Sequence, residues 1–73
     1  MVPLHCTGKV TKGPLAGWYI RAQEIEKPEG FLVSRARNAP MDQTLLLDGI
    51  FPDRDALEGF FEANAPGVDW QAE

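Results

Sequence analysis

One segment of the chain has the periodicity of an α-helix, and this segment limits what the remainder can fold into. Its apolar residues recur at one-turn spacing and are Ala56, Leu57, Phe60 and Phe61. Asp53 is a suitable N-cap, because its carboxylate can accept hydrogen bonds from the first backbone amides of a helix. Pro66 and Gly67 end the helix, since proline cannot continue it and glycine tolerates left-handed geometry. The pattern predicts one amphipathic helix over about residues 53–64.

The segments outside this helix have the turn signals and alternation of β-strands. Four strands are predicted, over residues 4–12, 18–26, 31–37 and 44–51. Residues 68–70 alternate between apolar and polar side chains and fit a short fifth strand at an edge. The run Leu45-Leu46-Leu47 predicts burial of the fourth strand on both faces. With no linker, repeat or low-complexity tract, residues 1–73 form a single α+β domain, a two-layer antiparallel β-meander of three to five strands with the helix on one face.

The turns also predict the register of the strands. Residues 28–30 fit a three-residue hairpin loop, which places Arg21 opposite Arg37, and pairing across the first turn places Lys9 opposite Arg21. The inner face, toward the helix, then carries Cys6, Val10, Trp18, Ile20, Ala22, Leu32, Ser34 and Ala36. The outer face carries His5, Thr7, Lys9, Thr11, Tyr19, Arg21, Gln23, Arg35 and Arg37. Both phenylalanines of the helix are expected to be largely buried against the inner face, where the central side chains are small.

The row Lys9–Arg21–Arg37 is the strongest functional hint in this register. Like charges directly opposite one another across strands are mildly destabilising, so a compensating partner is expected. One interpretation is an anion-binding face, extended by Arg35, with Tyr19 available to stack on a base or to support a peptide. The other, which we favour, is a solvated face whose arginines meet carboxylates elsewhere in the chain or in a second subunit.

Three aromatic residues are candidates for contacts. Trp18 is expected in the core, because it opens the apolar face of its strand. Tyr19 points to the opposite face and is the interface candidate, since tyrosines are enriched in binding hot spots. Trp70 is either a lid on the core or an exposed anchor for a partner.

Charge is distributed unevenly along the chain. Residues 1–37 carry a balance of +3 and residues 38–73 a balance of −7, which gives the net charge of −4. Such asymmetry predicts a polarised surface that can steer a partner. The negative total weakens the case for nucleic acid, whose binding depends on a local excess of cations.

No group of residues predicts catalysis, a cofactor or a metal site. Cys6 is the only cysteine and His5 the only histidine, and neighbours on a strand diverge. They therefore form neither a thiol–imidazole pair nor a four-ligand zinc site. Cys6 is expected to be a small buried residue and His5 a surface residue, while Ser34 falls on the predicted core face. Glu24 falls on the inner face, where a carboxylate needs a partner or a position at the sheet margin.

The cysteine content and the hydropathy also bear on the compartment. A single cysteine cannot form an internal disulfide, which agrees with a reducing environment. No run approaches the ~20 apolar residues of a membrane helix, and no signal segment opens the chain. We therefore expect a cytoplasmic protein with no membrane partner.

These observations favour a small non-enzymatic protein-binding or regulatory module of the inhibitor, immunity or adaptor type. Its partner is expected to be another protein or a second copy in a homodimer. The candidate binding face consists of Lys9, Tyr19, Arg21, Arg35, Arg37 and Trp70. The alternative is a nucleic-acid-binding module that uses the basic sheet face, and an enzyme is the least favoured class.

Overall fold

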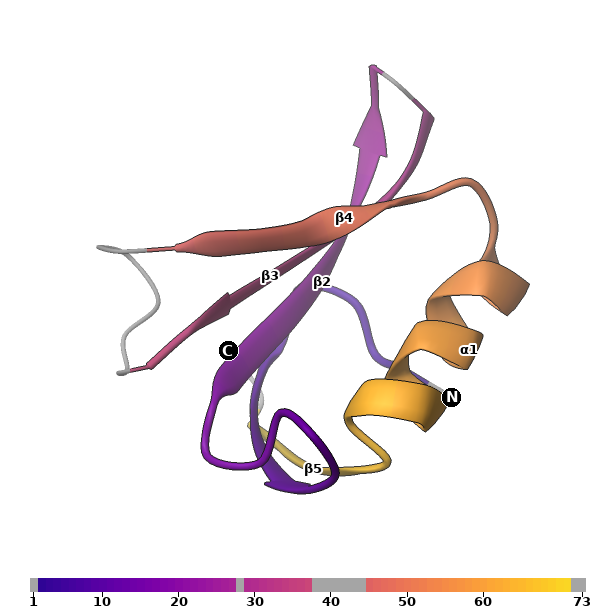
Figure 1. The fold of residues 1–73 in the computed structure, drawn as a ribbon. Helices are drawn as coiled ribbons and strands as arrows, with labels where there is room; N and C mark the ends of the chain where they lie inside the picture. Colours follow the sequence, from indigo (N-terminus) through magenta and orange to yellow (C-terminus); the bar gives the residue numbers. More distant parts are fainter. Residues whose placement is uncertain (1, 28, 38–44, 72–73) are drawn as a thin grey trace.

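A five-stranded antiparallel sheet with one helix on one face makes up the computed structural model, which describes residues 2–27, 29–37 and 45–71 (Figure 1). The elements in chain order are β1 (Thr7–Lys12), β2 (Tyr19–Glu26), β3 (Glu29–Ala36), β4 (Leu46–Phe51), α1 (Arg54–Asn64) and β5 (Gly67–Gln71). The strand order across the sheet is β4-β3-β2-β1-β5. Strands β1 to β4 form a meander, and the chain returns after α1 to place β5 beside β1. The predicted α+β fold is confirmed, including the short fifth strand.

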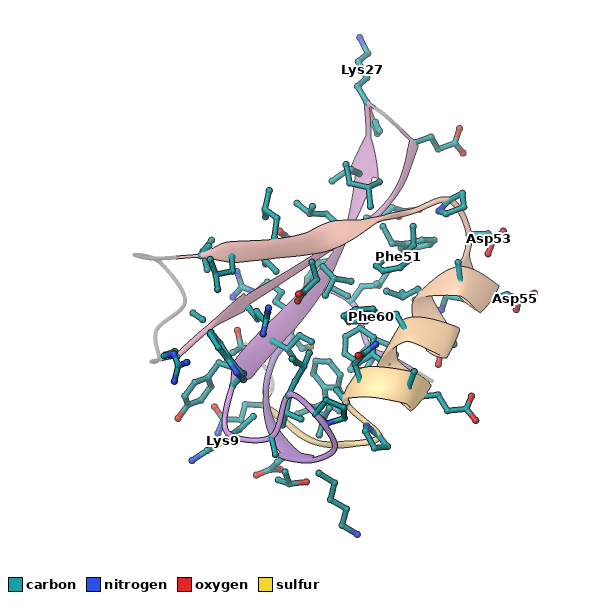
Figure 2. All side chains as sticks on the ribbon, in the orientation of Figure 1. Lys9, Lys27, Phe51, Asp53, Asp55 and Phe60 are labelled. Carbon is teal, nitrogen blue, oxygen red and sulfur yellow. The ribbon has the colours of Figure 1, made fainter. Side chains whose placement is uncertain are left out.

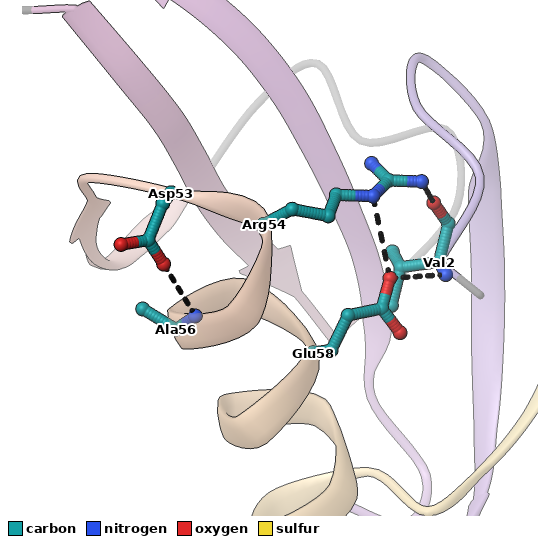
Figure 3. Close-up of polar contacts among 5 residues, drawn as sticks. All are labelled: Val2, Asp53, Arg54, Ala56 and Glu58. Carbon is teal, nitrogen blue, oxygen red and sulfur yellow. Dashed lines mark hydrogen bonds and ion pairs between the residues drawn. The ribbon is translucent and has the colours of Figure 1, made fainter.

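The helix begins and ends where the sequence predicts. Asp53 adopts an extended backbone, and its Oδ1 accepts a hydrogen bond from the Ala56 amide at 2.9 Å, as an N-cap does (Figure 3). At the other end the Ala65 amide donates to the Phe61 carbonyl at 2.7 Å, just before Pro66. Helix α1 is too short and too polar to cross a bilayer, and no other helix is present in the described residues.

The core lies between α1 and the centre of the sheet. Its largest fully buried side chains are Val10, Ile20, Val33 and Leu57. Phe61 is also buried, with 4% of its surface exposed, whereas Phe60 is only half-buried. The Phe60 ring packs on Phe51 at a centroid distance of 5.1 Å, and both rings lie between sheet and helix (Figure 2). Phe61 is therefore buried as predicted, and Phe60 is partly buried and packs against the core.

The first hairpin has the predicted faces but a different register. Lys9 pairs with Tyr19, and Gly8 pairs with Ile20, two residues away from the predicted pairing. The reason is that pairing with β2 ends at Val10, whose amide donates to the Trp18 carbonyl at 2.8 Å. On its other side β1 pairs with β5 along its length, from Thr7 opposite Gln71 to Lys12 opposite Gly67. An even shift leaves every side chain on its predicted face.

In the second hairpin the observed register differs from the predicted one by an odd number of residues. Strand β3 therefore turns toward the helix the side chains that were predicted to lie on the outer face. Arg21 pairs with Ser34, not with Arg37, and Ile20 pairs with Arg35. The helix side of β3 is therefore Phe31, Val33 and Arg35, whereas Leu32, Ser34 and Ala36 lie on the open face of the sheet. Ser34 and Ala36 are still buried, although not against the helix.

Gly30 explains why the loop prediction failed. The sequence pattern places Gly30 in a three-residue turn, but it lies within β3 and pairs with Ile25. Its φ is +155°, and an added Cβ would lie 2.5 Å from the Phe51 carbonyl oxygen. Glycine is needed here because the backbone of β4 approaches closely, which is a tertiary requirement and not a turn requirement.

The segment before β1 is attached to the helix. The Val2 amide donates to Glu58 Oε2 at 2.8 Å, and Arg54 Nη2 donates to the Val2 carbonyl at 2.6 Å (Figure 3). Arg54 Nε also lies 3.4 Å from Glu58 Oε2. This network holds Val2 in the core, where it is buried.

Candidate functional site

Strand β4 and the residue just before it expose a set of large apolar side chains at one edge of the sheet. Leu45, Leu46, Leu47 and Ile50 expose 43%, 45%, 68% and 47% of their surfaces, and we call these four residues the β4 patch. The sequence predicted that the leucine run is buried on both faces, and the structure contradicts this. In the sheet of described strands β4 lies at an edge and has β3 on one side, so no described strand covers its outer side.

The β4 patch extends around the edge onto both faces of the sheet. Leu47 lies opposite Ser34, and Ile50 lies opposite the half-buried Leu32, which places both on the open face. Leu46 lies opposite Arg35 and therefore on the helix side. The patch accordingly presents apolar side chains on both faces of the sheet at this edge.

The other edge strand, β5, has a different character. Val68 and Trp70 turn inward and pack against the core, while Asp69 and Gln71 are exposed and polar. A charged residue on an edge strand discourages pairing with another chain. The exposed side chains of β5 are therefore polar or charged, whereas the exposed large side chains at the β4 edge are aliphatic.

A β-bulge interrupts β4 at its centre. The register shifts between Val33, opposite Gly49, and Ser34, opposite Leu47, so that Asp48 is the extra residue. A bulge re-aims side chains, and here Asp48 Oδ1 lies 2.9 Å from Arg35 Nε.

The carboxyl group of Asp48 is in a costly environment. Its side chain is only 10% exposed, and its second oxygen, Oδ2, has no hydrogen-bond partner among the described residues. Burial raises the pKa of Asp48 above its usual value, and the nearby Arg35 guanidinium offsets only part of that rise. Neither Asp48 nor the β4 patch was predicted as part of a site, although the leucine run and the adjacent Asp48-Gly49 pair are the signals that mark them.

The structure does not assemble the predicted basic row. Lys9 lies opposite Tyr19, with its Nζ 5.8 Å from the centre of the tyrosine ring. Arg21 lies opposite Thr7 and donates from Nη2 to Thr7 Oγ1 at 3.0 Å. These side chains share the open face with Tyr19, as predicted, but Arg37 does not stand opposite Arg21.

The remaining two arginines gather around Trp18 instead. The Arg35 and Arg37 guanidinium carbons lie 4.5 and 4.4 Å from the centre of the tryptophan ring, which is typical of cation–π contact. Trp18 is half-buried and not a core residue, so its predicted role is wrong. The candidate binding face is thus divided between the two sides of the sheet.

Trp70 is a lid on the core. Its ring lies 5.7 Å from that of Phe61 and covers Gly8 on the neighbouring strand, where an added Cβ would lie 2.7 Å from the indole. This contact decides between the two predicted roles. The glycine permits the close approach of the ring, because any side chain would fill its place.

The residues considered for chemistry do not converge. His5 is exposed, as predicted, whereas Cys6 is half-buried and not fully buried. Glu24 is exposed at the sheet margin, which satisfies its carboxylate with solvent. Within residues 2–27, 29–37 and 45–71, no three histidine, cysteine, aspartate or glutamate side chains gather closely enough to hold a metal ion.

Comparison with known proteins finds no match to a protein-family model, to a curated protein or to a solved structure.

Proposed function

We propose that this chain is a small protein-binding module without catalytic activity and that it binds its partner through the β4 patch. The observation that carries the proposal is the exposure of four large aliphatic side chains, three on the edge strand β4 and Leu45 just before it. Single exposed apolar residues are common, but a contiguous group on an edge strand invites contact with another chain. The expected occupant is a protein that offers an extended strand with apolar side chains.

The contacts that the basic residues make within the chain support a protein partner. Arg35 is paired with Asp48, and both Arg35 and Arg37 are stacked on Trp18. Arg21 is bonded to Thr7. A polyanion needs several cations on one continuous surface, and these arginines lie on different sides of the sheet. We therefore keep the protein-binding hypothesis and do not propose nucleic-acid binding.

We also place the protein in the cytoplasm. Its single cysteine, Cys6, is half-buried and unpaired, as suits a reducing compartment.

Site-specific photo-crosslinking in the cells that make the protein tests the binding surface. A benzophenone amino acid is introduced at Ile50 in the β4 patch and, as the matched control, at Gln71 on the opposite edge strand. We expect a discrete crosslinked protein adduct from position 50 that Leu47→Lys abolishes, and none from position 71. Equal crosslinking from both positions, or none from position 50, would contradict the proposal.

A further inference from the structure

We propose that the occupant of the β4 patch is a second copy of this chain, with β4 antiparallel to its own copy across a two-fold axis. The inference rests on the proposed function and narrows it to one partner. In such an arrangement the two five-stranded sheets continue into one another, and each β4 becomes a central strand. The leucine run then packs against apolar side chains of the second copy. The sequence pattern predicts such burial, but within a single chain.

The side chains of the β4 patch are compatible with self-pairing. A two-fold axis places one surface against itself, so any exposed charge near the axis meets a like charge. All four exposed residues of the patch are aliphatic, and Asp48, the one charged residue of β4, turns to Arg35. The strand can therefore lie against its own copy without bringing exposed like charges together.

Strand β5 shows why the same argument fails at the other edge. Asp69 is its middle residue and is exposed. Centred self-pairing of β5 would place Asp69 directly opposite its own copy, which is destabilising. Of the two edges of the described sheet, β4 alone suits a two-fold contact.

The acidic residues of the helix do not oppose this arrangement. Helix α1 starts just beyond the C-terminal end of β4 (Figure 1), and Asp53 and Asp55 lie at that end (Figure 2). Antiparallel pairing sends the C-terminal ends of the two strands in opposite directions. They are then separated by about one strand length, roughly 20 Å for six residues, which exceeds the Debye length of ~8 Å at physiological salt. The carboxylates of Asp53 and Asp55 in the two copies are therefore largely screened from one another.

The size of the contact predicts a weak, reversible dimer. A stable interface buries about 800 Å² per partner, and the whole chain exposes only 4659 Å². One six-residue strand covers less than this, and the bulge at Asp48 restricts regular pairing to short runs on either side. Association should therefore depend on concentration in the micromolar range or above.

Sedimentation velocity from low micromolar to near-millimolar protein tests this inference. We expect the wild-type chain to move from monomer to dimer as concentration rises. Leu47→Lys, at the most exposed position, should weaken association at least tenfold, because it places a charge within the apolar contact between the copies. Gln71→Lys adds the same charge to β5 and should leave the dimerisation unchanged. Ile50→Lys is a second patch variant, and thermal melts establish that each variant is folded.

The outcomes separate the two proposals. A wild-type chain that stays monomeric while position 50 crosslinks to a different protein would overturn the second-copy inference and keep the protein-binding function. A dimer that survives both folded lysine variants places the interface elsewhere and also overturns the inference. A monomer with no crosslink would overturn both proposals.

Discussion

At the scale of single residues, Asp48 has an energetically unfavourable environment in the described structure. It lies in a bulge on an edge strand, is largely buried, and has one oxygen paired with Arg35 and the other without a hydrogen-bond partner among the described residues. A buried carboxylate costs free energy that one ion pair does not fully offset. The bulge keeps this charge off the exposed side of β4, at a cost in stability that a titration can measure.

The pH dependence of unfolding tests this view of Asp48. Its folded-state pKa is raised, so the folded protein binds the proton more tightly than the unfolded chain. Its contribution to stability is therefore most favourable below the unfolded value of ~3.9 and declines as pH rises through the raised folded pKa. Asp48→Asn removes this dependence, so the stability of the variant relative to wild type should increase across that window in urea titrations.

The same substitution at the exposed Asp69 is the control for the loss of one charge. If Asp48→Asn and Asp69→Asn have parallel stability profiles from pH 3 to pH 7, burial of Asp48 does not govern its titration.

Two glycines give a matched test of backbone approach. Gly30→Ala places a Cβ 2.5 Å from the Phe51 carbonyl at a φ of +155°, so β3 and β4 must separate. We expect a loss of ~1–3 kcal/mol in the free energy of unfolding. Gly59 lies in α1, where an added Cβ meets nothing within 4 Å. Gly59→Ala should therefore stabilise the protein by ~0.5–1 kcal/mol, as alanine does in an exposed helix. If urea denaturation shows that both substitutions change the free energy of unfolding in the same direction, this assignment is refuted.

At the scale of elements, the helix was predictable, whereas the second turn and the strand register were not. The N-cap, the apolar stripe and the Pro66-Gly67 stop are local signals, and α1 follows them. The register of β2 and β3 depends on Gly30, whose role is set by Phe51, twenty-one positions away in sequence. A glycine shortly after a proline is typical of a turn, whether the glycine is needed for the turn itself or for the close approach of a distant strand. The predicted pairing of Arg21 with Arg37 failed for this reason, whereas the pairing of Lys9 with Arg21 failed with the register of the first hairpin.

The helix start gives a prediction at this scale. Asp53→Ala removes the hydrogen bond to the Ala56 amide and should cost ~1 kcal/mol of stability. Glu62→Ala changes an exposed residue beyond the first turn and should be nearly neutral. Chemical denaturation of both variants measures the difference. Equal losses would mean that the cap contributes little to the helix.

At the scale of the whole molecule, the sequence predicts which segments form strands but not which of their side chains remain exposed. The run of leucines at residues 45–47 correctly indicates a strand that favours an apolar environment. Nothing in the run specifies whether its own chain or another supplies that environment, since both bury the same side chains. The structure shows that the described chain does not cover it. The β4 patch could therefore be recognised as a surface only once the order of the strands was known.

The stability supplied by the core limits how much destabilisation the chain tolerates before it unfolds. A domain of 73 residues has ~4–11 kcal/mol of stability at ~0.05–0.15 kcal/mol per residue. Phe61 is buried between Phe60 and Trp70, so Phe61→Ala should cost ~3–5 kcal/mol and bring the chain close to unfolding at room temperature. Phe60→Ala removes the same atoms from a half-buried position and should cost distinctly less. Urea titrations followed by tryptophan fluorescence compare the two, because Trp70 packs on the Phe61 ring. A Phe60→Ala variant that loses as much stability as Phe61→Ala would show that the core extends to the margin of the sheet, where Phe60 meets Phe51.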